Sequence, residues 1–251
     1  MRFLVTNDDG IYAEGIRVLI ETLSELGEVY IAAPNQERSG VGHAITVNRP
    51  LRIEKLSIFP GIKEAYMMDG TPADCVKLAI EAMELEVDFV VSGINNGANL
   101  GTDVFYSGTV AAAFEGALQS IPSIALSLCK KSAVDQGLYQ TAAQCLQEVL
   151  AKIQAAEIKG LLNINVPNIS YEQIKGFKTT KLGVGRYKNE FEKRLDPRGK
   201  PYYWMKGIKY EPDNPEEDDY RAVEHGFVSI TPLQVDMTNY EQLKSLKAIF
   251  S

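Results

Sequence analysis

Residues 3–10 read FLVTNDDG, in which an apolar, β-branched run ends in two acids and a glycine. Such a run is typical of a buried strand. Apolar residues then recur at helical spacing, at Ile16, Leu19, Ile20, Leu23 and Leu26, and Gly27 ends the pattern. A second strand is expected at residues 29–33, before Pro34. A strand, a helix and a strand in succession predict two parallel strands joined by a helical crossover.

The alternation continues along the chain. Further strands are expected at 87–91, 123–126 and 161–166, with helices at 110–118 and near 133–155. Residues 45–69 resemble an antiparallel excursion, after which Thr71 and Pro72 fit the cap and first turn of a helix. The pattern predicts a Rossmann-like open, mostly parallel α/β sheet with helices on both faces.

The texture of the sequence changes beyond Pro167. Residues 176–210 form two strand-like halves around the turn signal Asp196-Pro197-Arg198-Gly199. A single hairpin is marginal in water, so we expect this arm to pack on a neighbouring subunit. We expect a single domain over 1–251: a core at about 1–170 and 221–240, this arm, and a C-terminal helix at about 238–250.

Composition excludes several classes. The 251 residues are 45% hydrophobic and 24% charged, which is ordinary for a globular enzyme. Lys and Arg number 26 against 33 acids, so a broad basic face for duplex nucleic acid is not expected. The three cysteines form no C-x-x-C motif, and there is no apolar run long enough for a signal peptide or a membrane span. We therefore expect a cytoplasmic protein without a membrane partner.

Three polar segments follow predicted strands, at residues 7–10, 35–40 and 92–99. The carboxyl ends of parallel strands share one edge of a sheet, so these segments should converge. They offer carboxylate, hydroxyl and amide oxygens, which suit Mg²⁺, Mn²⁺ or Ca²⁺. In the alternative interpretation, Asp8 or Asp9 caps the next helix and the other acid is solvated.

The segment from Gly93 to Thr109 is a second candidate. Ser107, Gly108 and Thr109 directly precede the predicted helix at 110–118. Exposed N–H groups at a helix N-terminus, together with hydroxyls, can bind phosphate. The alternative is that Thr109 is only an N-cap.

Three further residues are candidates for the site, but each of them also has an ordinary structural explanation. His43 is a candidate for acid–base work or substrate binding, although a lone histidine is more often structural. Arg38 could neutralise a phosphate and Tyr106 could stack on a base, but either side chain could equally be solvated or packed. No dinucleotide-binding, P-loop or nucleophile-elbow motif is present. The residues alone thus indicate metal-assisted hydrolysis or transfer of phosphate.

At this point the sequence resembles the SurE survival-protein nucleotidases. The resemblance extends over the chain in the family's order, and the matching segments are 6–10 with Gly15, 33–40, 69–76, 92–101, 106–113 and 229–233 with Asp236 and Thr238.

The resemblance implies hydrolysis of nucleoside 5′- and 3′-monophosphates, and in some members of short polyphosphate. It implies one Mg²⁺ or Mn²⁺ per subunit and a homodimer or homotetramer formed by exchange of the arm. The metal ligands carry over to Asp8, Asp9, Ser39 and Asn95. The phosphate contacts carry over to Asn96, Ser107, Gly108 and Thr109.

As a hypothesis, Asp8 or Asp9 orients or deprotonates a water that attacks phosphorus in line, while Asn96 assists as a donor to the phosphate. A second possibility makes an aspartate the nucleophile. A hypothesis from another class is a module that senses a nucleotide or phosphate without turnover. The adjacent acids oppose it, because two carboxylates beside a phosphate would weaken simple anion binding.

Overall fold

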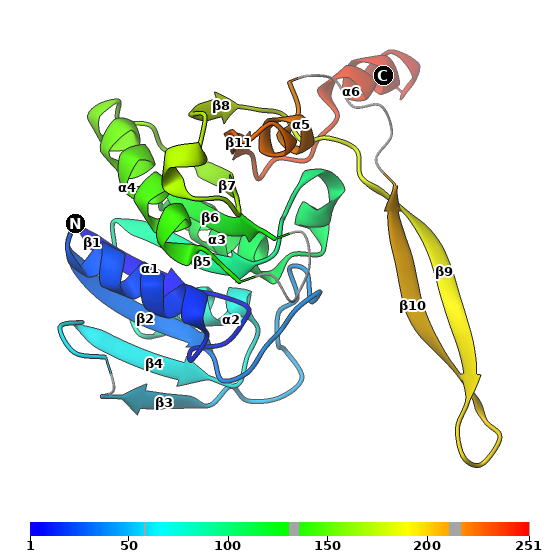
Figure 1. Ribbon diagram of the computed structural model, residues 1–251, viewed down its shortest axis with the longest axis horizontal. Coiled ribbons are helices and arrows are strands. Elements are labelled where there is room, and N and C mark those ends of the chain that lie inside the picture. Colours follow the sequence, from blue (N-terminus) through cyan, green and yellow to red (C-terminus); the bar gives the residue numbers. More distant parts are fainter. Residues whose placement is uncertain (58, 131–135, 211–216, 251) are drawn as a thin grey trace.

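The computed structural model describes residues 1–57, 59–130, 136–210 and 217–250. The strands are β1 (Arg2–Thr6), β2 (Glu28–Pro34), β3 (Ile53–Leu56), β4 (Glu64–Met68), β5 (Phe89–Asn96), β6 (Ser123–Cys129), β7 (Leu161–Pro167), β8 (Phe177–Thr179), β9 (Arg186–Leu195), β10 (Pro201–Tyr210) and β11 (Val228–Leu233). In the described residues, nine of them form one sheet in the order β3-β4-β2-β1-β5-β6-β7-β11-β8 (Figure 1).

The sheet is mostly parallel. Strands β4, β2, β1, β5, β6 and β7 run in one direction, whereas β3 is antiparallel to β4, and β11 is antiparallel to β7. The predicted α/β class and the antiparallel excursion before residue 69 are therefore confirmed.

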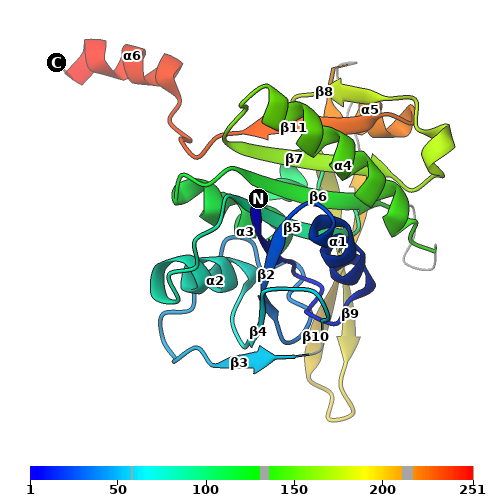
Figure 2. The same ribbon diagram turned by 90° about the vertical axis from the view of Figure 1, so that its left-hand side faces the viewer.

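The longer helices are α1 (Glu14–Ser24), α2 (Pro72–Lys77), α3 (Gly108–Leu118), α4 (Tyr139–Ala155), α5 (Asp219–Glu224) and α6 (Tyr240–Phe250). Short turns are η1 (Leu78–Ala82), η2 (Gly101–Phe105) and η3 (Tyr171–Gln173). Alternate residues of β1 show how the layers form, since Phe3 and Val5 belong to the core under α1 and α4, and Leu4 to the core under α2. A buried parallel strand must be apolar on both faces, which is why residues 3–5 are continuously apolar. Figure 2 shows these helices on opposite sides of the sheet.

Two boundaries differ from expectation. Strand β5 continues to Asn96 instead of ending at residue 91, with an irregular register between Ser92 and Asn95. Gly93 permits this, because it has φ +143° and a Cβ there would lie 2.3 Å from the carbonyl oxygen of Leu126. The long helix begins at Tyr139, and residues 133–135 of the expected range lie outside the described residues. The cap of α2 is as expected, with Thr71 and Asp74 forming a capping box.

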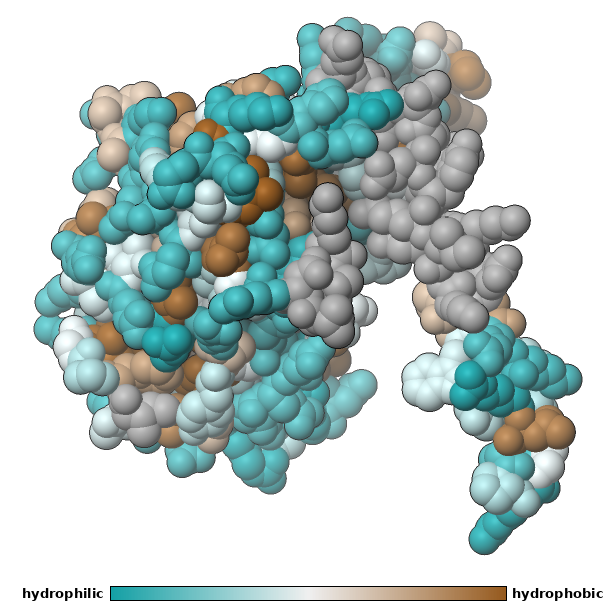
Figure 3. Space-filling model, viewed as in Figure 1, coloured by the Kyte–Doolittle hydropathy of each residue, from teal (hydrophilic) through white to brown (hydrophobic). Residues whose placement is uncertain are grey.

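The arm consists of β9 and β10, paired antiparallel from Arg186–Tyr210 to Leu195–Pro201. It extends away from the sheet (Figure 1), and Figure 3 shows brown, apolar atoms on it. Its exposed apolar side chains are Phe191, Leu195, Tyr202, Tyr203, Trp204 and Met205. Helix α6 likewise stands clear of the body and has no buried residue (Figure 2). None of the helices in the described residues combines the length and the apolar character that a membrane span needs.

Candidate active site

Asp8 and Asp9 follow β1 at the carboxyl edge of the sheet, and three segments meet there. The backbone amide of Arg38 donates to the carbonyl oxygen of Asp8 at 2.7 Å, which fixes the segment after β2. The amide of Asn96, at the end of β5, donates to Asp9 Oδ2 at 3.1 Å. The hydroxyl of Thr109 donates to Asp8 Oδ1 at 2.5 Å. The structure therefore brings together the polar segments that were expected, from the sequence, to converge.

The two carboxyl groups lie in an environment that disfavours negative charge. Burial raises the pKa of Asp8, which is only 5% exposed, despite the hydrogen bond from Thr109. Burial, followed by the charge of Asp8, raises the pKa of Asp9 to about 6. A nearby cation would relieve both effects, because it stabilises the charged form of a desolvated carboxylate.

The donor set fits a hard divalent cation. The Asn95 amide nitrogen donates to Gly97 O at 2.9 Å, so its amide oxygen is the atom available to a ligand. Ser39 lies next to Arg38 and donates its hydroxyl to Glu37 at 2.6 Å, in an exposed position. Two carboxylates, one amide oxygen and one hydroxyl are oxygen ligands of the kind that Mg²⁺ and Mn²⁺ take. The described residues hold no group of three or more His, Cys, Asp and Glu side chains suited to a metal, and this donor set contains only two such residues.

Further buried polar atoms surround this point. Asn7 Oδ1, Thr6 Oγ1 and Ser92 Oγ have no hydrogen-bond partner within the described part of the chain. Thr6 and Ser92 are paired across β1 and β5, directly below the acids. Buried polar groups are normally satisfied, so these orphans indicate that the edge is built for polar ligands.

The N-terminus of α3 closes against the acids. The Ser107 hydroxyl accepts from the amide of Val110 at 3.0 Å, so Ser107 is the N-cap. A Cβ on Gly108 would lie 2.9 Å from Asp8 Cβ and 3.1 Å from Asp8 Oδ2, so only glycine lets the helix approach so closely. The N-terminus of a helix favours an anion such as phosphate, and here it lies beside the acids.

Two alternative interpretations from the sequence are wrong. Thr109 is not the N-cap, since Ser107 takes that position and Thr109 binds Asp8. Neither acid caps α1, whose N-cap is Ala13 without a side-chain bond. Ser, Thr and Asp can all cap a helix, so the choice between neighbours depends on tertiary contacts.

The side chain of His43 is bonded to Glu115 of α3. Its Nε2 lies 3.0 Å from Glu115 Oε2, and Lys77 Nζ lies 3.3 Å from Glu115 Oε1. Glu115 is 4% exposed, and its hydrogen bond with His43 lowers its pKa. His43 therefore joins the segment that carries Ser39 to the middle of α3.

The other candidates are spread around the site. The guanidinium of Arg38 donates to the carbonyl oxygen of Asp69 at 3.0 Å, and its Nε is buried without a partner in the described residues. Tyr106 is 65% exposed beside Ser107. His225, the second histidine of the sequence, is the C-cap of α5.

Sequence reasoning missed a set of buried asparagines behind the site. Asn165 Oδ1 accepts from the Asn99 amide at 2.9 Å, and the amide nitrogens of Asn163 and Asn165 donate to Asn99 O at 2.8 and 3.0 Å. The signal was the alternation Asn163-Ile164-Asn165-Val166 in a strand that should be buried on both faces. These asparagines bind the backbone of Asn99, a role that cannot be recognised before Asn99 is placed against β7.

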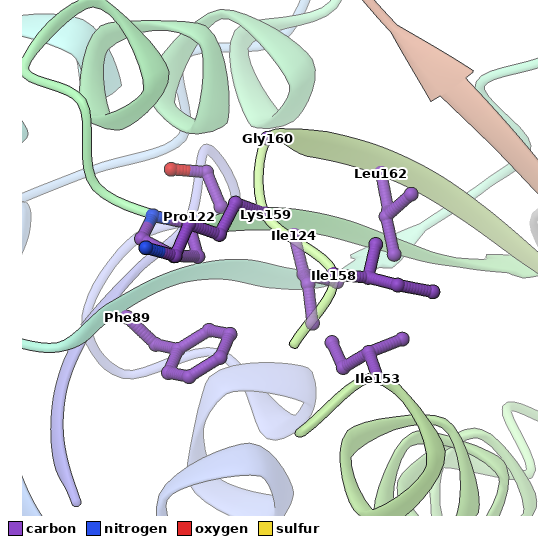
Figure 4. Close-up of a pocket in the computed structure, with 9 residues that line it drawn as sticks. Phe89, Pro122, Ile124, Ile153, Ile158, Lys159, Gly160 and Leu162 are labelled. Carbon is purple, nitrogen blue, oxygen red and sulfur yellow. The ribbon is translucent and has the colours of Figure 1, made fainter. Parts of the chain in front are cut away.

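An apolar pocket is present at another place. It is lined by Phe89, Pro122, Ile124 and Ile158 among others (Figure 4). Phe89 and Ser123 begin β5 and β6, so the pocket lies at the amino edge of the sheet, opposite the acids. It offers no carboxylate, and ligands of open α/β sheets bind at the carboxyl edge.

Known proteins share the sequence pattern and the fold of this chain. The family model described as "Survival protein SurE" matches residues 3–189. A 5′-nucleotidase SurE from Alkaliphilus metalliredigens is 49% identical over 98% of both chains. One from Syntrophomonas wolfei is 47% identical over 100% of this chain and 95% of its own. The crystal structure of the SurE protein from Aquifex aeolicus superposes with a TM-score of 0.85 and 41% identity, and all of both chains is covered. The chain belongs to the SurE family.

Proposed function

We propose that this chain is a metal-dependent nucleotidase that hydrolyses nucleoside 5′- and 3′-monophosphates to nucleoside and phosphate. The 5′-nucleotidase relatives, similar over their full length, support nucleotidase activity. The observation that carries the proposal is the contact of the α3 N-terminus with Asp8, because a helix N-terminus next to two desolvated acids suits a phosphate and a cation together. Cleavage of the 3′-ester and of short polyphosphate is part of the proposal, since both present the same terminal phosphate group.

Asp8, Asp9, Ser39 and Asn95 would hold one Mg²⁺ or Mn²⁺. When bound, the cation would supply Lewis-acid chemistry, neutralising phosphate charge and making water more acidic. The support for this set is the raised pKa of both acids and the free amide oxygen of Asn95.

Asn96, Ser107, Gly108 and Thr109 would bind the non-bridging oxygens of the phosphate. The hydrogen bond from Thr109 holds Asp8 in one orientation, and the amide of Asn96 does the same for Asp9. Asp8 or Asp9 then orients a water in line with the leaving oxygen and takes its proton. In the second mechanism, an aspartate attacks phosphorus itself and displaces the nucleoside oxygen, and water then hydrolyses the aspartyl phosphate.

The deciding experiment is phosphate release from a panel of nucleoside 5′- and 3′-monophosphates, a short polyphosphate and one aryl phosphate, run with Mn²⁺, Mg²⁺ and EDTA in parallel. We expect release that depends on metal and favours nucleotides. Absence of release with every metal, from folded protein, would contradict the proposal and favour the sensing module. That module would also bind nucleotide in EDTA.

The stereochemistry at phosphorus separates the two mechanisms. A nucleoside monophosphate that carries a chiral [¹⁶O,¹⁸O]thiophosphate group is hydrolysed in ¹⁷O-water. Inversion at phosphorus in the released thiophosphate supports a single in-line attack by water, whereas retention supports two successive displacements through an aspartyl phosphate.

We also propose a cytoplasmic homodimer or homotetramer. The exposed apolar side chains of the arm support self-association, since a two-stranded hairpin has little stability of its own.

A further inference from the structure

Both roots of the β9–β10 arm meet at one point on the body. The incoming root is residues 181–185 and the outgoing root is residues 217–220. The amide of Lys181 donates to Glu217 O at 3.2 Å, and the amide of Asp219 donates to Lys181 O at 3.1 Å. The two roots are therefore held together by backbone hydrogen bonds.

The carboxylate of Asp219 extends this junction to a third segment. Its Oδ1 accepts from the amide of Gly183 at 2.8 Å, and its Oδ2 accepts from the amide of Gly101 at 2.7 Å. Asp219 is fully buried. A buried carboxylate that receives two backbone N–H groups from separate segments fixes their relative position, because each bond is charge-assisted and costly to leave unmade.

The neighbouring Tyr220 packs into the same junction. Its hydroxyl donates to Leu100 O at 2.9 Å. A Cβ on Gly101 or on Gly183 would come within 2.6 Å of its ring, and one on Gly185 within 2.2 Å of its hydroxyl. The Thr102 hydroxyl adds a bond to Gly185 O at 2.7 Å. Because glycine has no Cβ, the backbone at Gly101, Gly183 and Gly185 can pack directly against the side chain of Tyr220.

Residues 99–106 connect this junction to the candidate active site. On one side they follow Asn95 and Asn96 of β5, and on the other they lead through η2 to Ser107, the cap of α3. The carbonyl oxygen of Tyr106 also accepts from the amide of Gly42 at 3.0 Å, which connects the segment after β2. A displacement at Gly101 would thus reach all the proposed phosphate contacts.

We infer that Asp219 is a positioning residue, which ties residues 99–106 to the roots of the arm, so that the placement of the arm sets the geometry of the phosphate site. The inference rests on the proposed function. Asp219 touches no substrate and acts through Gly101. Rotation or release of the arm roots would move the segment that carries the donors to the phosphate.

The test compares Asp219→Asn with Asp218→Asn. Both variants remove one buried acid of the same arm root, but Asp218 only caps α5 through the amide of Arg221 at 2.8 Å and is not hydrogen-bonded to residues 99–106 in the structure. An amide at position 219 turns its NH2 group toward either the Gly101 amide or the Gly183 amide and loses the hydrogen bond from that amide. Hydrogen–deuterium exchange is measured on the peptides that cover 97–107 and 181–185, and turnover is measured on the substrate panel.

We expect Asp219→Asn to increase exchange in both peptides together and to lower kcat by about tenfold for every substrate, as expected from loss of a charge-assisted hydrogen bond. Asp218→Asn should change melting temperature more than kcat. If Asp219→Asn does not fold, Tyr220→Phe, which removes the bond to Leu100, should show a smaller increase in exchange over 97–107.

Equal exchange and equal kcat in the two Asn variants would overturn the inference. The proposed function fails by another result, namely wild-type protein that releases no phosphate. The exchange measurement does not need activity, so it supports or refutes the connection between the two segments in either case.

Discussion

Asp8 shows how much one residue depends on its surroundings. Its backbone carbonyl holds Arg38, its carboxylate holds Thr109, and the would-be Cβ of Gly108 lies against its side chain. Asp8→Asn keeps the shape of the side chain and the backbone hydrogen bond with Arg38 but removes the charge that would attract a cation. We expect turnover to fall about 100-fold or more, with the fold intact. Near-normal activity in this variant, with a circular-dichroism spectrum like that of wild type, would show that the metal site is assigned wrongly.

Gly108→Ala tests the close approach of the helix. Alanine is the better helix former, so the helix itself should not suffer. The added methyl group would meet Asp8 Cβ at 2.9 Å and must push α3 or Asp8 aside. We expect at least about a tenfold loss of kcat/KM together with weaker inhibition by inorganic phosphate. Unchanged inhibition by phosphate would contradict the placement of the anion at this turn.

The raised pKa of Asp9 predicts how the binding of a metal ion depends on pH. In the folded chain its pKa is raised from 3.8 to about 6. Between these values the folded state holds more protons than the unfolded state, so the contribution of Asp9 to stability falls as pH rises without metal. A bound cation requires the charged form. The increase in Tm caused by Mn²⁺ should therefore be small near about pH 5 and full above about pH 7. An increase that is independent of pH would contradict a role for Asp9 as ligand.

At the scale of elements, several side-chain hydrogen bonds hold the segment between β2 and β3 on the body, and His43 supplies one of them. His43→Ala removes one of the two ion-pair partners that the buried carboxylate of Glu115 has among the described residues and leaves Lys77. The side chain of His43 is 35% exposed, so we expect a modest cost of about 1 kcal/mol, or about 2–4 °C in Tm. Because Ser39 lies on the same segment, Mn²⁺ affinity should fall as well. Val47→Ala, at a side chain 80% exposed, is the matched control and should change neither quantity. Unchanged Mn²⁺ affinity in His43→Ala would limit His43 to stability.

At the scale of the whole molecule, the arm carries the only tryptophan of the sequence, Trp204, which is 61% exposed. If arms are exchanged between subunits, Trp204 is buried in the oligomer and exposed after dissociation. Dilution should therefore shift its emission to longer wavelength, in step with the fall in mass measured by light scattering. Trp204→Glu should lower the mass at a given concentration. A monomer at every concentration, with constant emission, would contradict assembly through the arm.

Local patterning was sufficient for most of the fold. Continuous apolar runs such as residues 3–5 can be buried only in a two-sided sheet, and the spacing of Ile16, Leu19 and Leu23 suits one face of a helix. The convergence of the polar segments followed from the rule that parallel strands end at one edge. The boundary of β5 was not predictable, because a glycine next to asparagines signals a loop as strongly as an irregular strand.

The sequence by itself determined the α/β class, the edge at which the polar residues meet and, through the SurE motifs, the family. Each of these depends on residue type and spacing along the chain. Only the tertiary structure decided that Ser107 caps α3 while Thr109 binds Asp8, that His43 faces Glu115, and that Asp219 joins Gly101 to Gly183. The bonds of His43 and Asp219 span from 36 to 118 residues, and that of Thr109 to Asp8 spans 101. No local preference selects partners at such separations, since the packing of the sheet brings them within reach.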